Sequence, residues 1–181
     1  MVDDRVQESQ GLIHGSYEEL SPEVRSLFNP ALCAIVIRNY AIAYRKATPV
    51  QSKRSPSLFS TYIMLPLVLH TGIRGNIVAH NNNFGLHRFI HTHPDALVNL
   101  PELVNGFRAI TKQAVLFGCL YGALEFSEDA EIVAAGKFAE TRIAAVTSGS
   151  DSTIMRAASR LGTWFSQLSD SEIVLHLCLT V

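Results

Sequence analysis

The sequence has few charged residues for a soluble domain and no excess of charge of either sign. Of its 181 residues, 17% are charged and 48% are hydrophobic, whereas about 25% charged residues are usual. The formal net charge of −1 and the pI near 6.6 differ from those of nucleic-acid-binding domains, whose pI often exceeds about 9. A positive mean hydropathy of +0.18 leaves two interpretations open: a compact, well-buried monomer, or a chain whose apolar surface is partly covered by a partner.

Long apolar runs and targeting signals are also missing. Arginines, a proline and a histidine interrupt the most apolar part of the chain, so no run reaches the roughly 20 residues of a membrane-spanning helix. Residues 1–10 are acidic and polar, unlike a secretory signal. The three cysteines lie among apolar residues without a CxxC pair, which favours reduced thiols. We therefore expect a cytoplasmic protein that makes no contact with a membrane.

Sequence motifs for catalysis and cofactor binding are absent. The chain has no GxGxxG, GxxxxGK[ST], GxSxG or HExxH, the patterns of dinucleotide, phosphate, nucleophile and zinc sites. His87 and His91 share a helix face, with His80 and His93 nearby, but Asp95 is the only acid close to them. This set is incomplete for zinc. The sequence thus predicts no catalytic residue, no cofactor and no metal, with a small metal-dependent enzyme built on these histidines as an alternative.

Helix signals dominate the chain. Asn29-Pro30 and Ser55-Pro56 each combine a helix N-cap with a proline suited to the first turn. A proline at position 66 predicts a kink or a restart in the second helix. Two glycines and three consecutive asparagines predict a turn-rich loop over residues 71–83. Apolar spacing predicts helices over residues 31–46, 57–70, 86–92 and 101–121, the last divisible at Thr111 or Gly118.

A short β-hairpin and a C-terminal helix pair complete the prediction. Strands are expected over residues 124–126 and 132–135, joined by a turn at 127–130. After a polar linker at 146–153, helices are expected over 154–168, with Asp151 as its N-cap, and over 173–179, opened by a Ser169–Glu172 capping box. The predicted fold is mainly α: one compact helical domain over residues 1–181. It has a helical core with a winged-helix-like hairpin at 27–145 and C-terminal helices at 150–181.

Large apolar side chains follow the linker. Leu161, Trp164 and Phe165 recur on one helix face, with Arg156 and Arg160 nearer the other. Either this helix packs back on the core, or it forms an apolar arm that docks on a partner. Buried aromatic residues are frequent hot spots of interfaces, so we expect these five residues at a partner interface.

Basic residues that suit nucleic acid are few. Lys53 and Arg54 end a basic connector, and Arg108 and Lys112 lie four apart on the helix before the hairpin. Because the basic residues are so few and the total charge is balanced, the sequence predicts at most weak or indirect contact with DNA. Such contact would be made through these four residues and within a complex.

Four segments in order resemble the middle component of three-component ABC-type systems, a group that includes the small subunit of Lamassu-type bacterial antiviral defence. The segments are the Asn29-Pro30 helix start, YIMLPLVLH at 62–70 with Arg74 following, LFGCLYGAL at 116–124 and RAASRLGTWF at 156–165. The resemblance spans about residues 27–179. It carries no catalytic residue over to this chain.

The resemblance implies partners rather than a reaction: an SMC- or Rad50-like ABC ATPase and an effector, often a nuclease. We therefore expect a non-enzymatic accessory subunit that bridges these partners in an anti-phage or anti-plasmid defence complex. The alternative is a winged-helix regulator that binds DNA.

Overall fold

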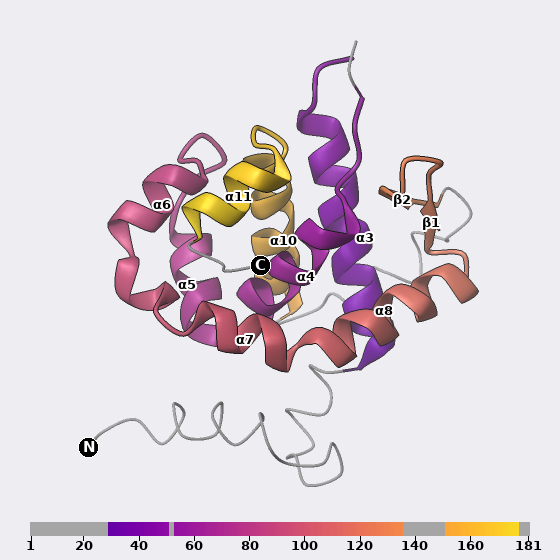
Figure 1. The fold of residues 1–181 in the computed structure, drawn as a ribbon, viewed down its shortest axis with the longest axis horizontal. Coiled ribbons are helices and arrows are strands. Elements are labelled where there is room, and N and C mark those ends of the chain that lie inside the picture. Colours follow the sequence, from indigo (N-terminus) through magenta and orange to yellow (C-terminus); the bar gives the residue numbers. More distant parts are fainter. Residues whose placement is uncertain (1–28, 51–52, 136–150, 178–181) are drawn as a thin grey trace, which may run out of the picture.

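Two long helices that are far apart in the sequence, α3 (Pro30–Ala47) and α10 (Asp151–Phe165), lie side by side at the centre of the fold (Figure 1). The computed structural model describes residues 29–50, 53–135 and 151–177. The Oδ1 atom of Asn29 accepts the N–H of Ala31 at 2.9 Å, so the predicted cap forms. This confirms the predicted helix over 31–46, and α3 is buried around most of its circumference.

The N-cap of the second helix, α4 (Leu58–Leu69), lies two residues after the predicted one. Ser57, not Ser55, is the N-cap, and its Oγ accepts the N–H of Ser60 at 3.0 Å. The N–H of Ser55 instead donates to the Glu131 carboxylate at 2.9 Å. The helix passes through Pro66 and ends three residues beyond it. A proline disturbs a helix because it lacks an N–H and clashes with the preceding turn. Neither effect ends α4 at Pro66.

The predicted loop over 71–83 is wrong for its first nine residues, because Thr71–Ala79 form helix α5, whereas residues 80–83 form the predicted turn. His70 caps this helix, with its Nδ1 accepting the N–H of Ile73 at 3.3 Å. Ile73 and Ile77 are one helical turn apart, and both are buried in the core. Burial of this apolar pair outweighs the low helix propensity of two glycines, since tertiary packing commonly overrides propensity.

The predicted helix over 101–121 is two helices, α7 (Leu100–Gly106) and α8 (Arg108–Leu120), preceded by α6 (Leu86–Thr92) and a short 3₁₀ turn, η3 (Pro94–Leu97). The break falls at Phe107, whose side chain turns into the core with 8% exposure. Neither Thr111 nor Gly118 divides α8. A Cβ atom at Gly118 would lie only 2.5 Å from Leu124 Cδ1, so this glycine allows the hairpin to approach the helix.

The predicted hairpin is confirmed as β1 (Leu124–Phe126) paired antiparallel with β2 (Ile132–Ala134), with Glu125 opposite Val133. Strand β2 packs against α3 (Figure 1), and a bridge between Ser57 and Glu131 ties the hairpin to the start of α4. The described part of the chain is thus mostly helical with one small two-stranded sheet. The winged-helix assignment itself stays a prediction.

The C-terminal helix pair is also confirmed. Helix α11 (Asp170–His176) opens with the predicted capping box, in which the Glu172 carboxylate accepts the N–H of Ser169 at 2.7 Å. Asp151 is the first residue of α10. The predicted linker at 146–150, and residues 178–179 of the predicted last helix, lie outside the described residues.

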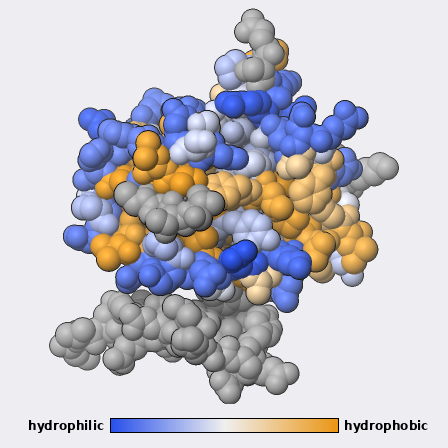
Figure 2. Space-filling view, in the orientation of Figure 1, coloured by the Kyte–Doolittle hydropathy of each residue, from blue (hydrophilic) through white to orange (hydrophobic). Residues whose placement is uncertain are grey.

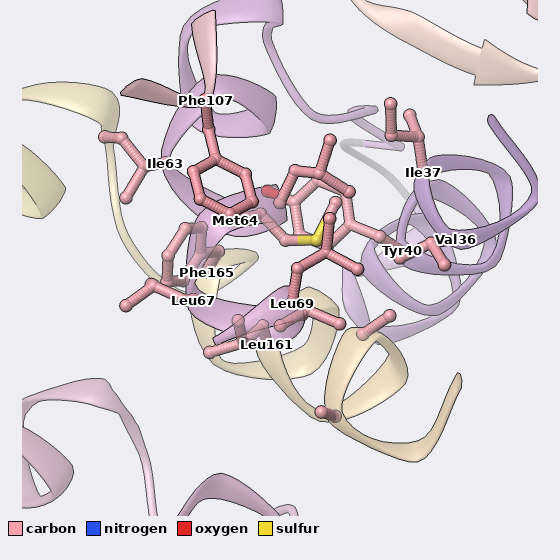
Figure 3. Close-up of a cluster of buried hydrophobic side chains, with 14 of the residues drawn as sticks. Val36, Ile37, Tyr40, Ile63, Met64, Leu67, Leu69, Phe107, Leu161 and Phe165 are labelled. Atoms are coloured by element: carbon pink, nitrogen blue, oxygen red, sulfur yellow. The ribbon is translucent and has the colours of Figure 1, made fainter. Parts of the chain in front are cut away.

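Helices α3, α4 and α10 share one apolar core. Figure 3 shows its side chains converging from these helices, with Phe107 reaching in from the start of α8. Labelled members are Val36, Ile37, Tyr40, Ile63, Met64, Leu67, Leu69, Leu161 and Phe165. In the described ranges, every helix is too short or too polar to cross a bilayer.

Candidate functional site

The structure places Trp164 in the core. Its side chain is 0% exposed, its indole Nε1 donates to the Asn82 carbonyl at 3.0 Å, and its ring lies 5.5 Å from that of Phe89. Of the two arrangements that the sequence left open, the helix packed back on the core is the one observed. A buried indole with a satisfied N–H is typical of a structural tryptophan.

The neighbours of Trp164 are equally buried. Leu161 and Phe165 are both 0% exposed, and the Phe165 ring packs edge-on against Tyr40 at 6.1 Å. A Cβ atom at Gly162 would lie 2.6 Å from the Tyr40 carbonyl oxygen, so α10 and α3 are in backbone contact there. A surface that docks on a partner without opening this core must be made of other side chains.

The two arginines of the same helix differ from each other. Arg160 is half-buried and donates from Nη1 to the Ile77 carbonyl at 2.9 Å, which ties α10 to α5. Arg156 is exposed. Of the five residues predicted at a partner interface, Arg156 is therefore the one with an exposed side chain.

An exposed apolar surface lies instead where α8 meets the hairpin. We call it the α8–β1 patch; its members and exposed fractions are Leu116 (59%), Leu120 (79%), Tyr121 (60%) and Phe126 (49%). The half-buried ring of Phe117 packs against the Tyr121 ring in a tilted arrangement, with 4.3 Å between the ring centroids. Figure 2 shows hydrophobic surface on the side of the molecule where Figure 1 places α8 and β1. Clustered exposed hydrophobic residues of this kind mark interaction sites.

Sequence reasoning missed this patch although the spacing was visible. Arg108, Lys112, Leu116 and Leu120 recur every four residues, so they form one stripe on α8. All four are exposed. The stripe is basic in its first half and apolar in its second, and the structure shows that the apolar half faces solvent as the basic half does.

A basic groove lies beside the C-terminal end of α3. We call it the α3–β2 groove: it has a volume of about 440 Å³ and is lined by Ala41, Ile42, Arg45, Lys46, Thr48, Val50, Lys53, Val133 and Ala134. Arg54 follows Lys53 in the chain and is also exposed. Its charge opposes the effect of burial, which raises the pKa of Tyr44. The tertiary structure therefore adds Arg45 and Lys46 to the predicted pair Lys53 and Arg54.

The four residues predicted for DNA contact do not form one surface. Lys53 lines the groove beside the C-terminal end of α3, whereas Arg108 and Lys112 are exposed at the start of α8. Figure 1 shows the C-terminal end of α3 at the top of the view and the α7–α8 junction at the bottom. A duplex would have to contact two separate faces to meet both pairs.

The histidines pair with each other and with aromatic rings. The Nε2 atoms of His80 and His93 are 2.8 Å apart, and the His80 ring stacks on Phe84 at 3.7 Å. Burial, then the charges of His93 and Arg160, lower the pKa of His80. Among the described residues, no three or more His, Cys, Asp or Glu side chains come together as metal ligands. That the protein binds no metal stays a prediction.

Helix α11 contributes a histidine that sequence reasoning did not include. The His176 ring lies 5.2 Å from that of His87, which in turn lies 4.5 Å from His91. His87 and His91 are exposed, so these contacts lie on the surface between α6 and α11.

Comparison with known proteins gives one match. A family model described as ABC-three component (ABC-3C) system Middle Component 3 matches residues 17–179, which is most of the chain. No curated protein and no solved structure matches the chain.

Proposed function

Since the chain belongs to the family of ABC-three component system middle component 3 proteins, we propose that it is a non-enzymatic accessory subunit that bridges larger partners. Membership makes it one component of a multi-component system, so protein partners follow directly. It also confirms the resemblance to middle components that the sequence motifs indicate. The narrower likeness to the small subunit of Lamassu-type defence belongs to the proposal.

The proposed partners are an SMC- or Rad50-like ABC ATPase and an effector, a nuclease, in a bacterial anti-phage or anti-plasmid defence complex. The chain itself contains no GxxxxGK[ST] phosphate-binding loop. An ABC system needs such a loop to bind nucleotide. The missing loop supports a separate ATPase component and an accessory role for this chain.

The observation that carries the proposal is the α8–β1 patch. It exposes two leucines and two aromatic rings on α8 and on the hairpin that contacts this helix, in a chain with only 17% charged residues. Aromatic residues are enriched in the desolvated centres of interfaces, and truncating a hot-spot residue costs about 2 kcal/mol or more of binding free energy. We assign this patch to the ATPase component.

Co-purification with the products of the adjacent genes tests the proposal. Leu120→Glu places a charge in the patch, and we expect at least about a thirtyfold loss of affinity for the ATPase component. Leu175→Glu is the matched control, because Leu175 is also an exposed helical leucine (74%) but lies on α11. Both variants should keep the melting temperature of the wild type.

Two results would count against the proposal. Wild-type affinity of the Leu120→Glu variant would exclude the patch as the docking surface. Failure of the wild-type chain to form any complex with the ATPase or effector would exclude the bridging role itself.

A winged-helix DNA-binding regulator is the second candidate, because the hairpin follows a helix that exposes Arg108 and Lys112. Salt-sensitive DNA binding by the isolated chain, weakened by charge reversal at Lys53, Arg54, Arg108 and Lys112, would favour it. If the accessory role is right, DNA binding is weak and occurs only within the complex.

A further inference from the structure

The α3–β2 groove is lined by positively charged and by apolar side chains. Arg45, Lys46 and Lys53 are exposed and are the charged side chains of the described lining, which contains no acidic residue. The carboxylate of Glu131, on the hairpin nearby, accepts the N–H of Ser55 and is not part of the lining. The described lining of the groove therefore presents cations to solvent and contains no anion.

Part of this charge has a local explanation, and part does not. Arg45 and Lys46 lie in the last turn of α3, where cations interact favourably with the negative end of the helix dipole. Lys53 comes from beyond the end of the helix and has no such role. Its convergence with the other two cations is a consequence of the chain turning back toward α4.

The remaining described lining is mostly aliphatic. Ile42 is 41% exposed and Val50 is 82% exposed, and Val133 and Ala134 of β2 also line the groove. The volume of about 440 Å³ is within the range of sites that enclose small ligands. It has room for one or two aliphatic side chains beside the three cations.

This chemistry fits an acidic peptide better than a nucleic acid. Single-stranded nucleic acids are bound by stacking their bases on aromatic rings, and the part of the groove lining that the structure describes contains none. Proteins that bind duplex DNA tightly commonly make about 6–10 phosphate contacts, whereas Arg108 and Lys112 lie on another face. The three cations at one short groove match a few carboxylates instead.

We propose that the α3–β2 groove binds an acidic segment of a partner component and that this segment inserts an aliphatic side chain between Ile42 and Val133. The inference rests on the proposed function, because it requires a partner protein. It adds a second contact to the α8–β1 patch. The hairpin lies between the two surfaces: β1 carries Phe126 of the patch, and β2 lines the groove.

Carbodiimide cross-linking of the complex assembled from the adjacent genes tests this contact, because the reagent joins lysine amines to carboxylates in direct contact. We expect Lys46 and Lys53 to be linked to Asp or Glu residues of one partner segment. Mass spectrometry identifies the linked residues. Lys112, an exposed lysine on α8, is the internal control and should not be linked to that segment.

Charge variants give an independent measurement. The double variant Lys46→Glu/Lys53→Glu should bind the partner at least about tenfold more weakly, with the difference shrinking at high salt. The variant Lys46→Arg/Lys53→Arg should keep the affinity while losing the cross-links. Lys112→Glu should bind as the wild type does.

The failures of the two proposals can be distinguished. If the complex forms but Lys46→Glu/Lys53→Glu retains wild-type affinity, the groove proposal is overturned and the bridging function stands. It is also overturned if the cross-links run only to acidic residues within residues 1–28 of this chain, or if the same double variant loses binding to a single-stranded oligonucleotide instead. If the wild-type chain forms no complex, both proposals fall.

Discussion

The contact between α3 and α10 can be tested with a single methyl group. Gly162 lies in α10, where a Cβ atom would be 2.6 Å from the carbonyl oxygen of Tyr40 and 2.9 Å from the backbone nitrogen of Tyr44. Both of these atoms belong to the backbone of α3 and cannot rotate away. Gly162→Ala therefore forces the two central helices apart by several tenths of an ångström.

Two opposing effects set the magnitude. Replacing glycine by alanine inside a helix stabilises it by about 0.5–1 kcal/mol when there is room for the methyl group. Overpacking a well-packed core costs about 1–3 kcal/mol. At Gly162 the second effect dominates, because the displaced contact is between the two central helices of the core. We expect a net loss of about 1–2 kcal/mol of unfolding free energy.

Gly75 provides the matched control. It lies inside α5, and a Cβ atom there would meet no heavy atom within 4 Å. Gly75→Ala should therefore stabilise the protein by about 0.5–1 kcal/mol. For a chain of this size 1 kcal/mol corresponds to roughly 2–4 °C. The two alanine variants should then differ in melting temperature by about 3–12 °C.

Urea unfolding followed by far-UV circular dichroism measures both variants. A Gly162→Ala variant that is as stable as Gly75→Ala would refute the close approach of α3 and α10. Equal destabilisation by both substitutions would show that local helix conformation, not the contact between the helices, decides the effect.

Two further predictions concern a core side chain of α10 and the N-cap of α5. Trp164→Ala should lower the unfolding free energy of the isolated chain by about 3–5 kcal/mol in urea titrations, because it opens a cavity; an unchanged stability with loss of partner binding would instead make Trp164 an interface residue. Burial, and then the charge of Arg74, lower the pKa of His70 from 6.5, and the neutral ring accepts the N–H of Ile73. The folded state thus binds fewer protons, so stability should fall as the pH drops from 6.5 through the lowered pKa. His70→Asn keeps an N-cap without a titrating group, and its melting temperature should depend less on pH between 7 and 5; an unchanged pH dependence would exclude His70 as the cause.

The candidate surfaces were only partly predictable. Lys53 and Arg54 were visible as a basic connector, but the groove needs Arg45, Lys46 and strand β2, which the chain brings together only on folding. The α8–β1 patch was hidden because apolar residues on a helix are usually assigned to its buried face. Exposure, unlike hydrophobicity, is a property of the neighbouring elements.

The sequence by itself determined most of the helix starts and the hairpin. Caps such as Asn29 and the Ser169–Glu172 box act over a few residues, so local chemistry is sufficient to place them. Tertiary structure decided the rest. Helix α5 forms despite its two glycines because Ile73 and Ile77 are buried in the core. Trp164 is a core residue because the backbone of α10 approaches that of α3 at Gly162. These outcomes depend on contacts between residues more than 80 positions apart, whose free energy of burial no local pattern contains.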